Sequence, residues 1–395
     1  MAHVLAVAGD TLVTMALAGS LFFSISPQAA RGRVALYLLL TMAPFVVLAP
    51  LIGPVLDRRP QGRRAVLVAT AASRAVVCLS MASHLGGLWL FPHAFAVLAL
   101  SKAHMVTKSA LVPATVARSE QLVGANSRLA VLSVVAGFAA ALPGLILLKV
   151  DALGATWVVR LAALAFLAAT VAGMRMRRPP APSPDAAYRA GRGEAELHTM
   201  GVRAGALAMT VLRAVVGFLT FLLAFAFRSA DAPSWWFGVV LGASMVGSFV
   251  GSAAAPRLRR RLAEERMLQG ALVLVAVAAV LSARAGGLAP AVVMATVVGA
   301  AAGAAKLAFD SVVQRDAPDA IRGRTFARFE THFQLAWVLG AAVPVVLPVP
   351  QRAGMDLVAL ASTLTLFAYF GGVVAAAHRG RHFTSVGGEV DAGQP

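Results

Sequence analysis

The chain has 395 residues, of which 59% are apolar and only 13% are charged. About a quarter of the residues in a typical soluble domain are charged, so this composition excludes an ordinary soluble globule and indicates a polytopic protein embedded in a lipid bilayer. The net charge of +18 does not indicate a nucleic-acid partner, because no segment is long enough to form a soluble domain with a basic, aromatic-rich surface. The single cysteine, Cys78, excludes an intrachain disulfide and a cysteine-based metal site.

Twelve stretches are long and apolar enough to cross a bilayer, which takes about 20 residues in a helix. The first has no basic segment before it and is followed by further spans, so it is predicted to be a first helix and not a cleaved signal peptide. We predict an all-α membrane protein with twelve transmembrane helices at residues 3–25, 34–56, 65–86, 92–114, 127–148, 153–174, 203–227, 235–256, 267–284, 288–309, 326–348 and 354–377.

A polar segment divides these helices into two sets of six. Residues 175–202 hold a proline-rich run, several arginines and three acids without helical periodicity, which is typical of a flexible linker. We therefore predict a six-helix half at 1–174, a second six-helix half at 203–378 and a flexible tail at 379–395. Since this plan contains no additional interaction domain, we expect a monomer.

The distribution of lysine and arginine predicts the orientation, because positively charged loops stay on the cytoplasmic side of a cell membrane. The segments on the side of the two termini hold 23 of these residues, whereas the segments on the opposite side hold six. We therefore predict that the linker and both termini lie in the cytoplasm.

A basic loop between the second and third predicted helices carries the most specific motif of the chain. Two glycines permit a tight reversal of the backbone, and an acid and several arginines lie between and beside them. The motif positions are Gly53, Asp57, Arg58, Gly62, Arg63 and Arg64. In the second half, residues 251–261 keep the glycine and the arginines but lack the acid. Further segments that match between the halves are 109–113 with 311–315 and 126–128 with 323–324.

This loop resembles the signature of the major facilitator superfamily, G-x-x-x-D-R-x-G-R-R, with one additional residue before the second glycine. The resemblance, to the bacterial efflux-like branch, covers the chain apart from the linker and the tail. It implies two pseudo-symmetric six-helix halves related by an axis along the membrane normal. It also implies a central cavity, lined by the first, fourth, seventh and tenth helices, through which a small molecule moves by alternating access.

Ionisable residues at membrane depth are expensive and normally face a cavity or a partner. The four helices that the resemblance places around the cavity carry several of them. Our candidates for cavity residues are Lys102, His104, Arg213 and Lys306. Such a cationic cavity favours an anionic or zwitterionic amphipathic substrate. For His104 an alternative stays open, namely an interior histidine whose hydrogen bonds are satisfied.

Two acids on the same helices carry separate hypotheses. Asp10 is our candidate for proton coupling, in which it binds a proton from one side of the membrane and releases it to the other. The alternative is a structural ion pair, for which Arg74 and Arg160 are the candidate arginines. Lys108 and Asp310 are mates in the repeat alignment, and we expect them to form a cytoplasmic gate pair between the halves. Alternatively, Lys108 extends separately to the cytoplasm.

Two predicted helices carry glycines at the small-residue spacing that lets transmembrane helices approach closely. These glycines are Gly238, Gly242, Gly247 and Gly251 in the eighth helix and Gly299 and Gly303 in the tenth. Helix packing is a sufficient explanation for all of them.

No nucleophile elbow, zinc-ligand spacing or phosphate-binding glycine loop occurs in the sequence, so we predict no enzymatic activity, no cofactor and no bound metal. We predict a secondary-active transporter that exports a small amphipathic anion or zwitterion in exchange for protons or another ion. Two alternatives stay open. One is uptake, or lipid movement between leaflets, and the other is a transporter-like sensor that binds a ligand without moving it.

Overall fold

The computed structural model describes residues 1–21, 62–85, 89–116, 121–150, 154–176, 200–230, 232–233, 235–316 and 322–387. Throughout these ranges the regular structure is helical. The elements are α1 (Ala2–Leu21), α3 (Arg63–Met81), α4 (Leu90–Leu111), η3 (Val112–Thr115), α5 (Leu122–Lys149), α6 (Gly154–Met174), α8 (Met200–Ser229), α9 (Trp235–Arg259), α10 (Glu264–Ala285), α11 (Leu288–Asp316), α12 (Arg322–Val346) and α13 (Gln351–Gly387). The long helices match eleven of the predicted spans, and the predicted span at 34–56 lies outside the described residues.

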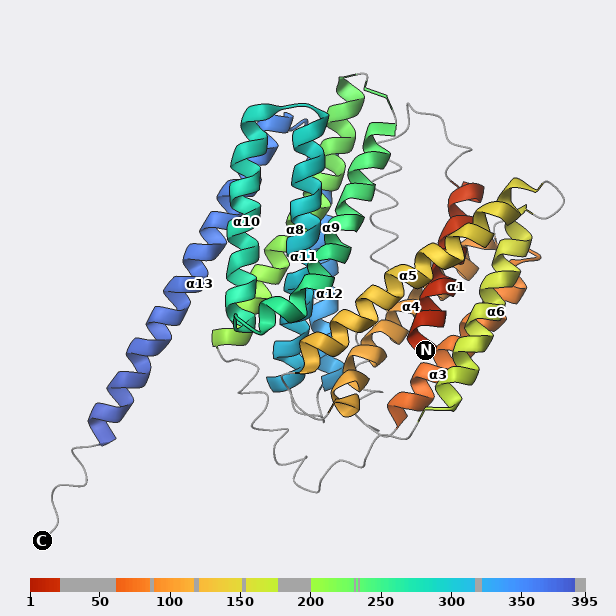
Figure 1. The fold of residues 1–395 in the computed structure, drawn as a ribbon, viewed down its shortest axis with the longest axis horizontal. Coiled ribbons are helices and arrows are strands. Elements are labelled where there is room, and N and C mark those ends of the chain that lie inside the picture. Colours follow the sequence, from red (N-terminus) through yellow and green to blue (C-terminus); the bar gives the residue numbers. More distant parts are fainter. Residues whose placement is uncertain are drawn as a thin grey trace, which may run out of the picture.

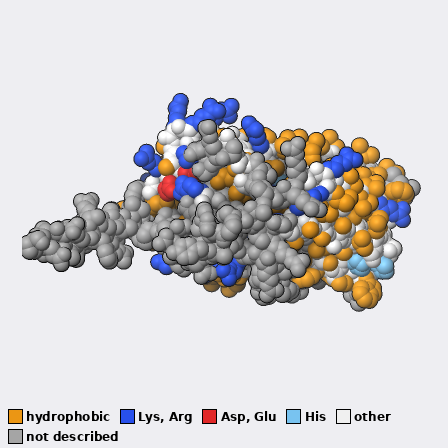
Figure 2. Space-filling model, turned by 90° about the horizontal axis from the view of Figure 1, so that it is seen from below, with side chains coloured by type: hydrophobic (Ala, Val, Ile, Leu, Met, Phe, Trp, Pro, Cys, Tyr) orange, Lys and Arg blue, Asp and Glu red, His pale blue; other side chains and the backbone are white. Residues whose placement is uncertain are grey.

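The outer faces of these helices are apolar. Among the described residues, eight helices are long and apolar enough to cross a membrane, and α1 adds a shorter apolar segment, Ala2–Leu17. On α5, Val135, Phe138, Leu142 and Ile146 are 55–66% exposed, and their spacing of three or four residues places them on one face. Apolar side chains also cover much of the described surface of the first helices when the molecule is viewed from below (Figure 2). Such a surface fits lipid and not water.

The helices pack as two bundles (Figure 1). The first bundle contains α1, α3, α4, α5 and α6, and the second contains α8 to α13. The bundles touch where α5 lies against α9 and α11, and where α4 lies against α12. From this end, which we call the joined end, the ribbons of the two bundles diverge (Figure 1).

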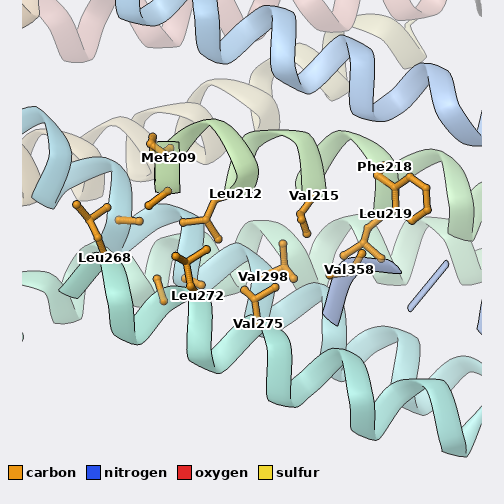
Figure 3. Close-up of a cluster of buried hydrophobic side chains, with 14 of the residues drawn as sticks. Met209, Leu212, Val215, Phe218, Leu219, Leu268, Leu272, Val275, Val298 and Val358 are labelled. Atoms are coloured by element: carbon orange, nitrogen blue, oxygen red, sulfur yellow. The ribbon is translucent and has the colours of Figure 1, made fainter. Parts of the chain in front are cut away.

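Close packing of α8 against its neighbours forms the largest core among the described residues (Figure 3). Its residues recur every three or four positions, which is the period of one helix face, and those named next are at most 4% exposed. They are Met209, Leu212, Val215 and Leu219 of α8, Leu268, Leu272 and Val275 of α10, and Val298 of α11. Because lipid is as apolar as leucine, this core stabilises the bundle through van der Waals packing more than through removal from water.

Two helix pairs of the second bundle approach so closely that only glycine fits between them. On α9, a Cβ at Gly247 or Gly251 would overlap the backbone of Thr296 or Ala300 of α11. The contact is reciprocal, because Gly299 and Gly303 of α11 face the backbone carbonyls of Ser244 and Ser248 of α9. The second pair is α8 and α12, where Gly217 and Gly340 meet the backbone of Trp337 and Ala214. The packing prediction is therefore confirmed for four glycines. Among the described residues it is wrong for Gly238 and Gly242, where a Cβ would meet no atom within 4 Å.

Two helices extend beyond their predicted ends. α11 continues to Asp316 and α13 to Gly387, past the predicted ends at residues 309 and 377. The first part of the expected flexible tail, residues 379–387, is therefore helical. Hydropathy indicates where a helix leaves the apolar layer and not where its backbone hydrogen bonds end. In α13 the helix can continue because residues 378–387 contain no proline. Residues 177–199 of the predicted linker and 388–395 of the tail lie outside the described residues.

Candidate functional site

A cavity of about 320 Å³ lies between the two bundles. Its charged lining residues are Lys108 of α4, Arg213 of α8, and Lys306 and Asp310 of α11. The volume is at the lower end of the range of about 300–1,000 Å³ typical of small-molecule sites. Because its lining comes from both bundles, any movement of one bundle against the other changes the shape of this cavity.

The charges of the second bundle form a buried triad around Lys306. The Lys306 ammonium lies 2.7 Å from Asp310 Oδ1 and 3.2 Å from Glu330 Oε2 of α12, and it also lies 5.9 Å from the centre of the Phe333 ring. The Lys306 side chain is 22% exposed, Asp310 9% and Glu330 15%. Carboxylates this far from water need a partner, and one lysine supplies it to both.

The predicted cavity residues divide into two groups. Arg213 and Lys306 line the cavity, whereas Lys102 and His104 are absent from its lining. His104 is buried behind His3, with the two rings stacked 5.6 Å apart, and its Nδ1 lies 3.5 Å from Thr70 Oγ1. His3 lines the cavity itself, and it was missed because it lies at the first turn of the first predicted helix.

Asp10 and Arg74 form the ion pair that was the structural alternative for Asp10. Arg74 Nη1 donates to both carboxylate oxygens of Asp10 at 3.0 and 3.1 Å, and Ser101 Oγ donates to Asp10 Oδ1 at 2.6 Å. Arg74 is fully buried and its guanidinium lies 4.5 Å from the centre of the Phe166 ring. The pair therefore ties α1, α3, α4 and α6 together inside the first bundle.

The second arginine proposed for an ion pair has a different environment. Arg160 is exposed near the start of α6, and its guanidinium lies 4.8 Å from the centre of the Trp157 ring. The two residues are three positions apart on one helix, which places them on the same face. Arg160 is thus held by a cation–π contact on its own helix and forms no ion pair with a described acid.

Lys108 and Asp310 do not form the predicted gate pair in this structure. Both line the cavity, but Asp310 is bonded to Lys306, four residues earlier on α11. Residues at this spacing are neighbours on a helix surface, so the local partner is available whatever the relative position of the bundles. The repeat alignment identified the helix ends that meet, but not the groups that bond there.

Neutral hydrogen bonds join the bundles instead. Asn126 Nδ2 of α5 donates to Gln314 Oε1 of α11 at 2.7 Å, and Gln314 Nε2 donates to the backbone carbonyl of Ser109 of α4 at 3.1 Å. Ser127 Oγ of α5 donates to the backbone carbonyl of Ser252 of α9 at 2.6 Å. We call these five residues the latch. Gln314 is 2% exposed and Asn126 is 4% exposed, so these bonds are shielded from water.

We expect Gln314→Leu to shift the equilibrium toward an arrangement in which the joined end is open. The substitution removes two neutral hydrogen bonds, each of which contributes about 0.5–1.5 kcal/mol, so the population ratio should change by about 5- to 150-fold. Electron–electron double resonance between spin labels at Gln121 and Arg260, both exposed near the joined end, measures the shift in a Cys78→Ala background.

Gln269→Leu is the matched control for this experiment, because Gln269 lies on α10, which packs against other helices of the second bundle. It should leave the distance distribution unchanged. An unchanged distribution for Gln314→Leu as well would show that the latch does not hold the joined end.

The described arginines of the loop motif hold helix ends together. Arg63 is 3% exposed, and its Nη1 donates to the carbonyl of Ala110 of α4 at 3.4 Å. Arg64 Nε donates to the carbonyl of Gly173 of α6 at 3.1 Å, and its Nη2 donates to that of Met174. Cations are favourable where helix carbonyls lack intrahelical partners. Gly62 caps α3, whereas Gly53, Asp57 and Arg58 lie outside the described residues.

In the second bundle an acid outside the matching loop supplies the missing carboxylate. Glu264 at the start of α10 is buried, and its Oε1 lies 2.7 Å from Arg259 Nε. Its Oε2 lies 3.4 Å from Arg315 Nη1, and Glu265 Oε1 lies 3.3 Å from Arg315 Nη2. This network joins the ends of α9, α10 and α11, and its Arg315 is the residue that follows Gln314 in the chain.

Residues 1–341 match the sequence profile of the Major Facilitator Superfamily. The chain belongs to this superfamily. Together with its long apolar helices, this makes it a multi-pass membrane protein.

Several mycobacterial proteins resemble this superfamily member. The chain is 30% identical over 373 residues to a protein of Mycobacterium leprae, which covers 85% of this chain and 64% of that protein. It is 31% identical over 291 residues to a protein of Mycobacterium tuberculosis, covering 63% of this chain and 51% of that protein. The chain thus spans about half to two thirds of the length of these relatives. An MFS-type transporter of Mycobacterium bovis is 30% identical over 377 residues, which cover 87% of this chain and 82% of that one.

Solved structures of other transporters share the fold. A bacterial homologue of the iron transporter ferroportin, in an outward-facing state, aligns with a TM-score of 0.71 and 17% identity over 94% of this chain and 98% of that chain. The human organic anion transporter MFSD10 aligns with a TM-score of 0.68 and 17% identity over 93% of this chain and 98% of that chain. At these identities the comparison shows a common fold.

Proposed function

We propose that the chain exports a small anionic or zwitterionic amphipathic molecule across the cell membrane in exchange for protons. The observation that supports this most is the cavity between the bundles, where Lys108 of one bundle and Arg213 of the other share one lining. Cations in a low-dielectric cavity favour a negatively charged ligand. The human organic anion transporter MFSD10, which has a similar fold, is an example of anion transport on this architecture.

The latch supports alternating access as the mode of transport. The three hydrogen bonds of the latch connect the bundles at the joined end, and breaking them would help to open the cavity toward that side. We assign the joined end, which carries Arg63 and Arg64 at the start of α3, to the cytoplasm because the segments predicted on that side hold 23 lysines and arginines against six. Both termini are then cytoplasmic, and the arrangement is outward-facing.

Asp10 is the residue that we propose for proton coupling. Its side chain is 34% exposed, although it is paired with the buried Arg74. In this mechanism Arg74 releases Asp10 during the transport cycle, and the carboxylate takes up a proton on one side of the membrane. A pair that never opens would instead be structural, and the two cases differ in proton movement.

Asp10→Asn tests this assignment in proteoliposomes with an imposed proton gradient. We expect the wild-type protein to change the interior pH when an anionic or zwitterionic amphiphile is added, and Asp10→Asn to abolish that change while ligand binding is retained. Asparagine still accepts a hydrogen bond from Arg74 and Ser101, but it leaves the charge of the buried Arg74 uncompensated, so the test uses only variant protein that still binds the ligand. Asp356→Asn, at an exposed carboxylate on α13, is the matched control and should behave like the wild type.

Two results would count against the proposal. Proton movement that survives in Asp10→Asn would return Asp10 to a purely structural role. Saturable binding without proton movement by the wild type, for anionic, zwitterionic and cationic amphiphiles alike, would favour a transporter coupled to another ion or a sensor.

A further inference from the structure

The cavity contains two kinds of positive charge. Lys306 is bonded to both Asp310 and Glu330, so the carboxylates of this region are already engaged. Lys108 and Arg213 face the same cavity from different bundles. Within the described ranges neither side chain forms a hydrogen bond or an ion pair within 4 Å, and Arg213 Nε is buried without a hydrogen-bond partner.

Two cations that lack a hydrogen bond or a close ion pair to any described residue, in a partly buried cavity, require an explanation. Buried charges are normally paired, because removing an ammonium or a guanidinium from water is costly. Buried polar groups without partners are rare in folded proteins and frequently mark a functional site. Here the two groups share one cavity and come from two bundles that move relative to each other in alternating access, which points to a ligand that occupies the space between them.

The geometry of the two donors limits the chemistry of that ligand. Arginine presents a planar fork that matches two oxygens of a carboxylate or a phosphate, and lysine provides a compact point charge with three donors. Neutral acceptors would leave both charges uncompensated. The serine hydroxyls of Ser244 and Ser248, which also line the cavity, add neutral donors suited to the remaining oxygens of an oxyanion.

We propose that Lys108 and Arg213 together bind the oxyanion group of the substrate, a carboxylate or a phosphate, and so bridge the two bundles through the ligand. We call this pair the clamp. That the ligand is the transported substrate rests on the proposed function. The clamp adds which group of that molecule, its oxyanion, the cavity binds. Lys306 belongs to the triad and is not part of the clamp, because its charge is compensated twice.

Binding of hexyl phosphate to the purified protein in a neutral detergent tests the clamp without any gradient or transport. We expect hexyl phosphate and hexanoate to bind and hexyltrimethylammonium not to bind. Lys108→Gln and Arg213→Gln should each weaken the affinity for hexyl phosphate at least ten-fold, since each removes a charge-assisted hydrogen bond. Arg160→Gln removes an exposed arginine outside the cavity and should leave the affinity unchanged.

The stability of the ligand-free variants provides a second measurement. If Lys108 and Arg213 had a structural role, their substitution would lower the unfolding temperature of the free protein. Because each substitution removes a charge that has no hydrogen bond and no ion pair within 4 Å to a described residue, the unfolding temperature of the free protein should stay the same or rise. Hexyl phosphate should raise the unfolding temperature of the wild type and of Arg160→Gln but not that of the clamp variants. A marked loss of stability in the free clamp variants would overturn the proposal, as would unchanged affinity.

The source of the oxyanion is distinguished by the surrounding lipid. In nanodiscs of phosphatidylcholine, addition of phosphatidic acid competes with hexyl phosphate if the clamp takes lipid headgroups, and leaves its binding unchanged if the clamp takes soluble anions. Either result supports an oxyanion site. Clamp-dependent binding without transport in proteoliposomes would contradict the proposed function alone, whereas transport without clamp-dependent oxyanion binding would contradict the clamp alone.

Discussion

Lys306→Met is expected to lower the folding stability by about 3–5 kcal/mol and to abolish transport. Removing one partner of a buried ion pair costs about this amount, because the remaining charge stays buried without compensation. Here the loss strands two carboxylates, Asp310 and Glu330, which the structure holds at 2.7 and 3.2 Å from the Lys306 ammonium. Thermal unfolding followed by intrinsic fluorescence in detergent, together with uptake into proteoliposomes, measures both effects.

Two further variants separate the charge from the side-chain volume. Combining Lys306→Met with Asp310→Asn and Glu330→Gln neutralises the stranded carboxylates, so most of the stability should return. Lys149→Met, at an exposed lysine in the last turn of α5, should have no effect. If Lys306→Met alone proved as stable as the wild type, the triad would not be a structural element of the second bundle.

Gly247→Ala is expected to lower the stability by about 1–3 kcal/mol, the range for overpacking a tight contact. A Cβ at this position would overlap the backbone of Thr296, and a backbone cannot move aside as a flexible side chain does. α9 and α11 would have to separate, which also displaces Lys306 and the latch residue Gln314. Unfolding temperature and the retention of transport measure the two consequences.

The control for this substitution lies on the same helix and has the opposite expected sign. At Gly242 a Cβ would meet nothing within 4 Å, and alanine is a better helix former than glycine by up to about 1 kcal/mol. Gly242→Ala should therefore leave the stability unchanged or raise it. Equal losses for Gly247→Ala and Gly242→Ala would mean that backbone proximity does not explain the role of these glycines.

Local features of the sequence were sufficient for much of the fold. Hydropathy located eleven of the helices that the structure describes, because insertion into lipid is decided within each span of about 20 residues. The Asp10–Arg74 pair was predictable as an alternative for a similar reason, since few groups at membrane depth can pair with a buried carboxylate. Hydropathy did not show where α11 ends, and Gln314 lies beyond the predicted end at residue 309.

The relation between the bundles was harder to predict. The repeat alignment brought together the correct helix ends but suggested an ion pair between Lys108 and Asp310. The partner of Asp310 is instead Lys306, which lies four residues earlier on the same helix. The bonds that join the bundles involve amide and hydroxyl groups, which carry no charge signal in a sequence. Which glycines touch another backbone also depends on the rotation of each helix, and spacing alone assigned Gly238 and Gly242 incorrectly.

The reciprocal glycine contacts have a mechanical consequence for the second bundle. They prevent α9 from sliding along α11, and α8 from sliding along α12, so each pair behaves as one stiff plate. Lys306 belongs to the first plate and Glu330 to the second, and their ion pair crosses the seam between them. This ion pair therefore couples the two plates, and a change of charge in the cavity acts directly on how strongly they are held together.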